Sequence, residues 1–140
     1  MKKIYIASDH AGFNLKESIK KKYSKIYKIF DLGPQSTKSV NYPDYAHKLS
    51  KFIRRNRNTF GVLICGSGQG MIMTANKHKN IRAALCYNAK STKLSRLHND
   101  ANVITLGERL ISKNLAFKCI NTFLNTKFEG GRHKKRVKKI

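Results

Sequence analysis

The chain has 140 residues, enough for one domain with a hydrophobic core, and contains no apolar run approaching the roughly 20 residues of a membrane span. Its formal net charge of +23 is spread over the predicted helices and is not interleaved with aromatic residues, which favours a solvated basic surface over a nucleic-acid platform. The three cysteines, Cys65, Cys86 and Cys119, lack metal-ligand spacing, which predicts free thiols, no bound metal and a cytoplasmic location.

Short apolar runs alternate with amphipathic segments along the chain. The predicted strands cover 3–8, 29–32, 62–65, 81–86 and 103–106. The predicted helices cover 13–25, 42–53, 70–77, 88–98 and 112–125, with the cluster at 54–58 ending the second. This alternation predicts a three-layer, Rossmann-like α/β fold, in which helices flank a five-stranded parallel sheet. We expect one domain over residues 1–140, with a C-terminal helical tail.

Periodicity also predicts which helical side chains are buried. Leu15, Ile19, Tyr23 and Ile26 share one face of the first helix, and Phe52 lies on the apolar stripe of the second. His47 has no evident partner, so we expect it on the surface.

Asp9 and His10 directly follow the first strand, where open α/β sheets bind ligands. Two interpretations of Asp9 stay open on these residues alone. The carboxylate could contact a ligand, or it could cap the helix that follows.

A glycine-rich turn follows the central strand and begins at Cys65, with Gly66, Gly68 and Gly70 at alternate positions. Such a turn brings backbone N–H groups close to an anion or a developing oxyanion. It is neither a dinucleotide fingerprint, because its third glycine comes one residue early, nor a nucleotide-phosphate loop, because it lacks Gly-Lys-Ser/Thr. A purely structural turn beside an inert thiol remains the alternative.

The parallel topology gathers polar groups at one edge of the sheet. Asp9, His10, Cys65 and the glycine turn are joined there by Arg109, which follows the last strand. An acid, a histidine, a thiol, oxyanion donors and a cation are the parts needed to abstract a proton beside a carbonyl in an anionic substrate. The run from His98 to Asn102 lies between a helix and a strand, where it could equally form a C-cap and turn.

Seven segments of the chain, in order, resemble one family. They are Ser-Asp-His-Ala-Gly-Phe at 8–13, Asn-Tyr-Pro-Asp-Tyr-Ala at 41–46, Cys-Gly-Ser-Gly-Gln-Gly at 65–70, Ala-Asn-Lys at 75–77, Ile-Arg-Ala at 81–83, Ser-Arg-x-His-Asn-Asp-Ala-Asn-Val at 95–103 and Phe-Glu-Gly-Gly-Arg-His at 128–133. Together they cover essentially the whole chain. This pattern is similar to ribose-5-phosphate isomerase type B, within the wider RpiB/LacA/LacB sugar-phosphate isomerases.

The resemblance implies isomerisation of ribose 5-phosphate to ribulose 5-phosphate, in the pentose phosphate pathway, through an enediolate and without a cofactor. By position, Cys65 is the base, and a thiol near a helix N-terminus and cations suits that role. Some members use a glutamate after the glycine turn instead, but Met71 stands there. His98 is implied to open the sugar ring. The implied substrate-binding residues are Asp9, His10, Gly66, Ser67, Gly68, Gln69, Gly70, Asn99, Arg109, Arg132 and Arg136.

The resemblance also implies a homodimer or tetramer with shared active sites, in which the tail, residues 126–140, contacts a partner subunit. Two alternatives remain beside the pentose reaction. One is isomerisation of a hexose 6-phosphate, such as allose or galactose 6-phosphate. The other is a basic nucleic-acid-binding protein, which leaves the ordered motifs around Asp9, Cys65 and His98 unexplained. We expect neither nucleic-acid nor membrane binding.

Overall fold

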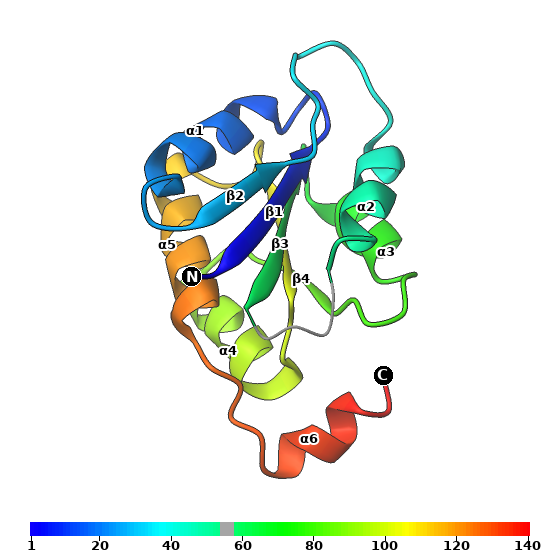
Figure 1. The fold of residues 1–140 in the computed structure, drawn as a ribbon, viewed down its shortest axis with the longest axis vertical. Helices are drawn as coiled ribbons and strands as arrows, with labels where there is room; N and C mark the ends of the chain where they lie inside the picture. The colour runs from blue at the N-terminus through cyan, green and yellow to red at the C-terminus, as the bar shows by residue number, and fades with distance from the viewer. Residues whose placement is uncertain (54–57) are drawn as a thin grey trace.

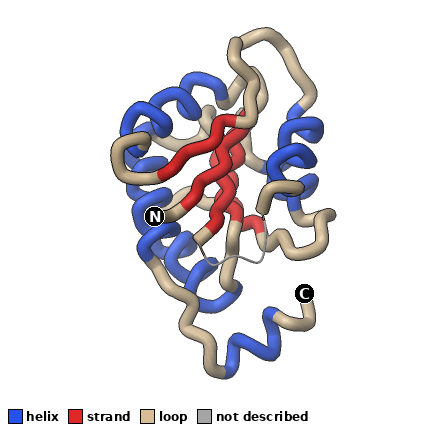
Figure 2. Tube along the Cα trace, viewed as in Figure 1, coloured by secondary structure: helices blue, strands red, loops and turns tan. Residues whose placement is uncertain are grey.

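A computed structural model describes residues 1–53 and 58–140 and places a parallel sheet at the centre of the molecule (Figure 1). The strands, in the spatial order β2-β1-β3-β5-β4, are β1 (Lys3–Ser8), β2 (Lys28–Asp31), β3 (Thr59–Cys65), β4 (Ala83–Leu85) and β5 (Val103–Gly107). The helices are α1 (Phe13–Tyr23), α2 (Tyr42–Ser50), α3 (Gln69–Ala75), α4 (Ala89–Asn99), α5 (Lys113–Asn125) and α6 (Arg132–Val137). Five parallel strands between helical layers confirm the predicted fold class (Figure 2).

Helices cover both faces of the sheet and create two cores. On one face, α1 and α5 pack on the sheet beside α4; α2 and α3 cover the other (Figure 1). The central strand β3 is buried along its whole length. Its side chains still alternate, with Val62 and Ile64 in the first core and Leu63 and Cys65 in the second. This alternation turns Cys65 towards the α2–α3 layer.

The strand order creates a crevice between β1 and β3. β1 pairs with β2 on one side and with β3 on the other, and the helices that follow β1 and β2 lie on opposite faces of the sheet. Such a topological switch point leaves an opening beyond the carboxyl ends of the strands. Asp9 follows β1 and Cys65 ends β3, so these residues flank the opening.

Two helices end earlier than their hydrophobic patterns predicted. α1 ends at Tyr23, whose carbonyl accepts hydrogen bonds from the N–H groups of Ile26 and Tyr27 in the following turn. Ile26 is 56% exposed, so its predicted burial was wrong. α2 ends at Ser50, and Phe52 beyond it is 42% exposed, so that prediction was also wrong. The predicted terminating cluster falls largely on residues 54–57, which lie outside the described residues.

The C-terminal helix α6 lies apart from the two cores. It contacts α4 and extends past the amino ends of the strands, opposite the switch point (Figure 1). Within residues 1–53 and 58–140, no helix combines the length and hydropathy that crossing a membrane requires.

Candidate active site

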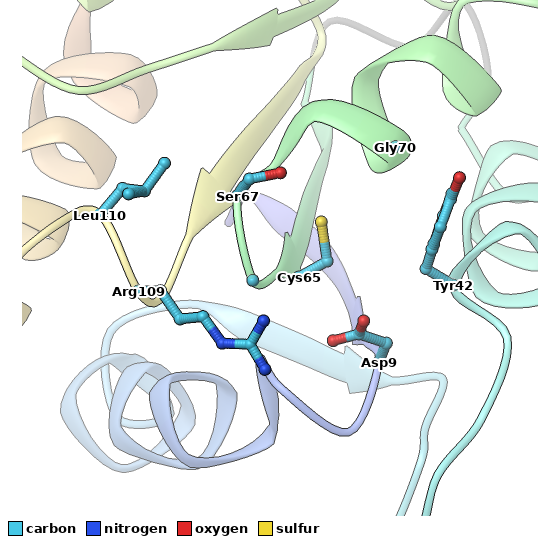
Figure 3. A pocket seen from close by; sticks show the side chains of 8 residues that line it. Asp9, Tyr42, Cys65, Ser67, Gly70, Arg109 and Leu110 are labelled. Carbon is cyan, nitrogen blue, oxygen red and sulfur yellow. The ribbon is translucent and has the colours of Figure 1, made fainter.

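A cavity of about 380 Å³ opens at the switch point between β1 and β3 (Figure 3). Its lining comes from four places in the chain: the end of β1, the start of α2, the glycine turn after β3 and the loop after β5. The lining residues are Asp9, Tyr42, Cys65, Gly66, Ser67, Gly70, Arg109 and Leu110. Six of them were predicted as site residues; Tyr42 and Leu110 were not.

Cys65 stands at the floor of this cavity. The thiol is 4% exposed, and its Sγ accepts a hydrogen bond from the backbone N–H of Gly68 at 3.1 Å. Gly68 has φ of 77°, in the left-handed region that side chains disfavour, and a Cβ there would lie 2.5 Å from the Leu85 side chain. The turn is therefore folded tightly around the sulfur, as its alternate glycines predicted.

Two tyrosines shape the glycine turn. The Tyr42 ring lies against Gly70, where an added Cβ would come within 2.3 Å of a ring carbon. Tyr87 follows β4, and its hydroxyl donates a hydrogen bond to the Ser67 carbonyl. Burial raises the pKa of Tyr87, and a negative charge on the nearby Cys65 raises it further. Tyr87 was missed, although its place after a strand end on the same sheet edge could have indicated it.

The two roles considered for Asp9, ligand contact and helix capping, fall to Asp9 and Glu108 respectively. Asp9 is 7% exposed, lines the cavity and accepts a hydrogen bond from the Gly12 N–H at 3.0 Å. The first turn of α1 is instead capped by Glu108, whose carboxylate accepts from the Leu15 N–H at 2.9 Å. Burial raises the pKa of Glu108, the nearby Asp9 raises it further, and the Leu15 hydrogen bond opposes both. The Asp9 carboxylate thus remains directed at the cavity.

Arg109 supplies positive charge to the same opening. Its backbone N–H donates to the Gly66 carbonyl at 3.0 Å, and its guanidinium passes so close to Gly66 that a Cβ there would meet it at 3.0 Å. Figure 3 shows this guanidinium on the same side of the opening as Asp9.

His10 lies outside the cavity lining, and its Nδ1 accepts a hydrogen bond from the Val40 N–H at 3.1 Å. Gln69 begins α3 and is exposed beside the turn.

The remaining predicted site residues lie at the opposite end of the sheet. His98 and Asn99 end α4, and Arg132 and Arg136 are exposed on α6, past the amino ends of the strands. The backbone there is anchored, because the Glu129 N–H donates to the Leu97 carbonyl at 3.0 Å. A single chain therefore presents two groups of predicted residues at opposite ends, and does not bring them into one pocket.

A pair of histidines, His47 and His78, lies away from the cavity and from the predicted site residues at the other end of the sheet. His47 Nδ1 lies 2.6 Å from His78 Nε2, and the rings meet edge to face. His47 is exposed, which confirms its predicted place on the surface, but the expectation that it lacks a partner was wrong, because the turn after α3 that carries His78 approaches α2 only in the folded chain.

The cavity combines a thiol, a carboxylate, a guanidinium and a hydroxyl around an opening large enough for a small anionic substrate. The thiol, once ionised, can act as a base, and Ser67 and Arg109 can face developing negative charge. This arrangement suits proton transfer on a small anionic molecule.

Comparisons with known proteins agree with this geometry. The family model described as Ribose/Galactose Isomerase matches residues 4–140. Ribose-5-phosphate isomerase B of Escherichia coli is 38% identical over 141 residues, covering 100% of this chain and 95% of the relative. A relative from Rickettsia conorii, 45% identical over 138 residues and covering 98% and 96% of the two chains, is named more broadly as a sugar phosphate isomerase.

Solved structures match over nearly the whole chain as well. The crystal structure of a ribose 5-phosphate isomerase from Thermotoga maritima is 48% identical with a TM-score of 0.94, covering 99% of this chain and 96% of that one. Ribose-5-phosphate isomerase B from Mycoplasma genitalium, solved with bound ribulose 5-phosphate, is 39% identical with a TM-score of 0.92, covering 98% and 92%.

Proposed function

Because the chain belongs to the Ribose/Galactose Isomerase family, we propose that it interconverts ribose 5-phosphate and ribulose 5-phosphate, a step of the pentose phosphate pathway. The observation that carries this proposal is the placement of Cys65 Sγ at the floor of the switch-point cavity, beside Asp9 and Arg109. The bound ribulose 5-phosphate of the Mycoplasma genitalium relative supports the substrate. Free thiols at all three cysteines fit a cytoplasmic enzyme.

Cys65 acts as the base in this proposal. Its thiolate removes the proton from C2 of the open-chain aldose; the electron pair of that C–H bond forms the C1–C2 double bond of an enediolate, and the π pair of the C1 carbonyl moves to O1. The thiol then returns the proton to C1, which takes up the C1–C2 π pair, while C2 and O2 form the new carbonyl and the proton of the O2 hydroxyl passes to O1. The Ser67 hydroxyl and the turn from Gly66 to Gly70 hold the oxygens on which charge develops, and Asp9 holds sugar hydroxyls.

The phosphate and the closed sugar ring need groups that the cavity of one chain lacks among its described lining residues. Arg109 and His10, which follows Asp9 after β1, supply part of the phosphate site. We assign the rest to a second copy, whose Arg132 and Arg136 bind the phosphate, whose His98 opens the ring and whose Asn99 contacts the substrate. The exposure of both α6 arginines and of Leu110, 61% exposed at the cavity rim, supports this shared site in a homodimer or a larger assembly.

Mixed dimers test the shared site. Cys65→Ala and His98→Asn chains are each expected to be inactive alone. After random reassociation, half of the dimers are mixed, and each mixed dimer has one site with an intact Cys65 and an intact His98. Activity should therefore return to about a quarter of the wild-type value. Mixtures as inactive as the parents would place Cys65 and His98 of one site in the same chain.

The substrate is tested by assaying ribose 5-phosphate and allose 6-phosphate side by side, with EDTA present. We expect metal-free turnover of the pentose. Turnover of the hexose alone would keep the reaction and change the substrate, whereas turnover of neither would remove the proposed activity.

A further inference from the structure

Three potential metal ligands converge beside α6, outside the cavity. His98, Glu129 and His133 each direct one ligand atom into a space where all three atoms lie within 4.8 Å of one another. The carboxylate Oε2 of Glu129 is 3.9 Å from Nε2 of each histidine. The two imidazole rings stack at a centroid distance of 4.3 Å. His98 lies at the end of α4, Glu129 in the loop before α6, and His133 in the first turn of α6.

His133 provides an independent indication of a ligand. It is 7% exposed, and its Nε2 has no hydrogen-bond partner within residues 1–53 and 58–140. A buried polar atom without a partner is costly and calls for an explanation. An unpartnered imidazole nitrogen offers a lone pair that can bind a metal.

We propose that His98, Glu129 and His133 form a binding site for a transition-metal ion of the Zn²⁺ type. Two imidazoles and one carboxylate suit Zn²⁺, Ni²⁺ or Co²⁺, with the remaining position open to water. The nearby guanidinium groups of Arg132 and Arg136 oppose any cation. Mg²⁺ and Ca²⁺ depend on oxygen ligands, and the cluster offers only one carboxylate, so both are excluded from the proposal.

Side-chain rotation is needed to bind the ion, because the two imidazole rings are stacked 15° from parallel and their in-plane lone pairs do not yet converge. Tetrahedral Zn²⁺ with bonds of about 2.0–2.1 Å needs ligand atoms roughly 3.3 Å apart. The widest pair must therefore close by at most about 1.5 Å, and the stacked rings must tilt towards one another. The side chains of His98 and Glu129 are 38% and 56% exposed, so both can rotate without repacking a core.

Occupation of this site would have two consequences. It would join the chain leading into α6 to the end of α4, restraining the segment that carries Arg132 and Arg136. It would also take the lone pair of His98 that ring opening requires, so zinc would inhibit turnover. The second consequence rests on the proposed function; the binding site does not.

Zinc binding is measured by calorimetry on the full chain carrying Cys65→Ser, so that the cavity thiol cannot bind the metal. We expect one equivalent of ZnCl₂ to bind, and Glu129→Gln and His133→Gln each to weaken binding by about tenfold or more. His78→Gln removes the other histidine pair and should leave the affinity unchanged. Circular dichroism without zinc verifies that each variant is folded, which the exposure of Glu129 favours.

Unchanged zinc affinity in a folded Glu129→Gln chain would overturn the site, as would binding weaker than about 1 mM in the parent. Loss of binding only in His78→Gln would assign the zinc to the other pair. These outcomes do not depend on isomerase turnover. In the active chain, zinc should inhibit the wild type at lower concentrations than Glu129→Gln, and equal inhibition would show that zinc acts elsewhere.

Discussion

The Tyr87 hydroxyl provides a sharp test of how the glycine turn is held. Tyr87→Phe removes the hydrogen bond to the Ser67 carbonyl and leaves the ring in place. The Ser67 carbonyl lies in the glycine turn, which we propose holds the enediolate oxygens. Loss of the hydrogen bond from Tyr87 should therefore relax this turn. The thiol of Cys65 would remain held by the N–H of Gly68.

The expected size follows from the bond that is lost. A neutral hydrogen bond in a half-buried position contributes about 0.5–1.5 kcal/mol. If the turn is ordered mainly for the transition state, this energy appears in kcat as a decrease of about 2- to 13-fold, with KM little changed. The free energy of unfolding should fall by a similar amount.

Tyr23→Phe is the matched control. The Tyr23 hydroxyl donates at 2.8 Å to the Asn121 side chain, between α1 and α5 and away from the cavity. This variant should lose at least as much stability while kcat and KM stay unchanged. Turnover of ribose 5-phosphate and urea unfolding are measured on both variants. The reasoning is refuted if Tyr87→Phe loses stability but retains full kcat, or if both variants lose kcat equally.

Two further predictions concern the cavity wall and the acid response. Gly70→Ala places a methyl group where the Tyr42 ring lies, and because Tyr42 is 40% exposed its ring should swing outward. We expect KM to rise roughly 3–10-fold while the free energy of unfolding stays nearly constant. An unchanged KM would show that the ring does not contact the substrate. Burial raises the pKa of Asp31, but hydrogen bonds from Lys16, Lys20 and the Gly33 N–H outweigh it and leave that pKa below its ordinary value. The ionised Asp31 carboxylate therefore stabilises the fold above about pH 4, and this stabilisation is lost as the pH falls further. The difference in free energy of unfolding between wild type and Asp31→Asn should be smaller at about pH 3 than at about pH 6. A constant difference would contradict this.

The architecture followed from the sequence because the relevant signals are local. The apolar run that ends at Cys65 and the three glycines after it fixed a strand and a turn, and the parallel topology then placed Asp9 and Arg109 at the same edge. The early end of α1 was not predictable from periodicity. Ile26 continues the apolar spacing, but the chain turns back on the Tyr23 carbonyl.

Contacts between residues that meet only in the folded chain could not be predicted from sequence patterns. The hydrogen bond from Tyr87 to Ser67 joins residues 20 positions apart on different elements, and neither residue alone indicates it. His98, Glu129 and His133 share no metal-binding spacing, because the ligands meet only when α6 and the loop before it return to α4. The His98 motif precedes a strand and Cys65 ends one, so the parallel topology places them at opposite ends of the sheet in one chain, although the resemblance assigns both to one site.

The central claim is that Cys65 moves the proton, and turnover of Cys65→Ala tests it most directly. Cys86→Ala removes a buried thiol outside the cavity and serves as the matched control. Cys65→Ala should lower kcat for ribose 5-phosphate by about 10²–10⁴-fold while the sugar phosphate still binds, and Cys86→Ala should keep wild-type turnover. Turnover by Cys65→Ala within about tenfold of the wild type would contradict the account and require another base.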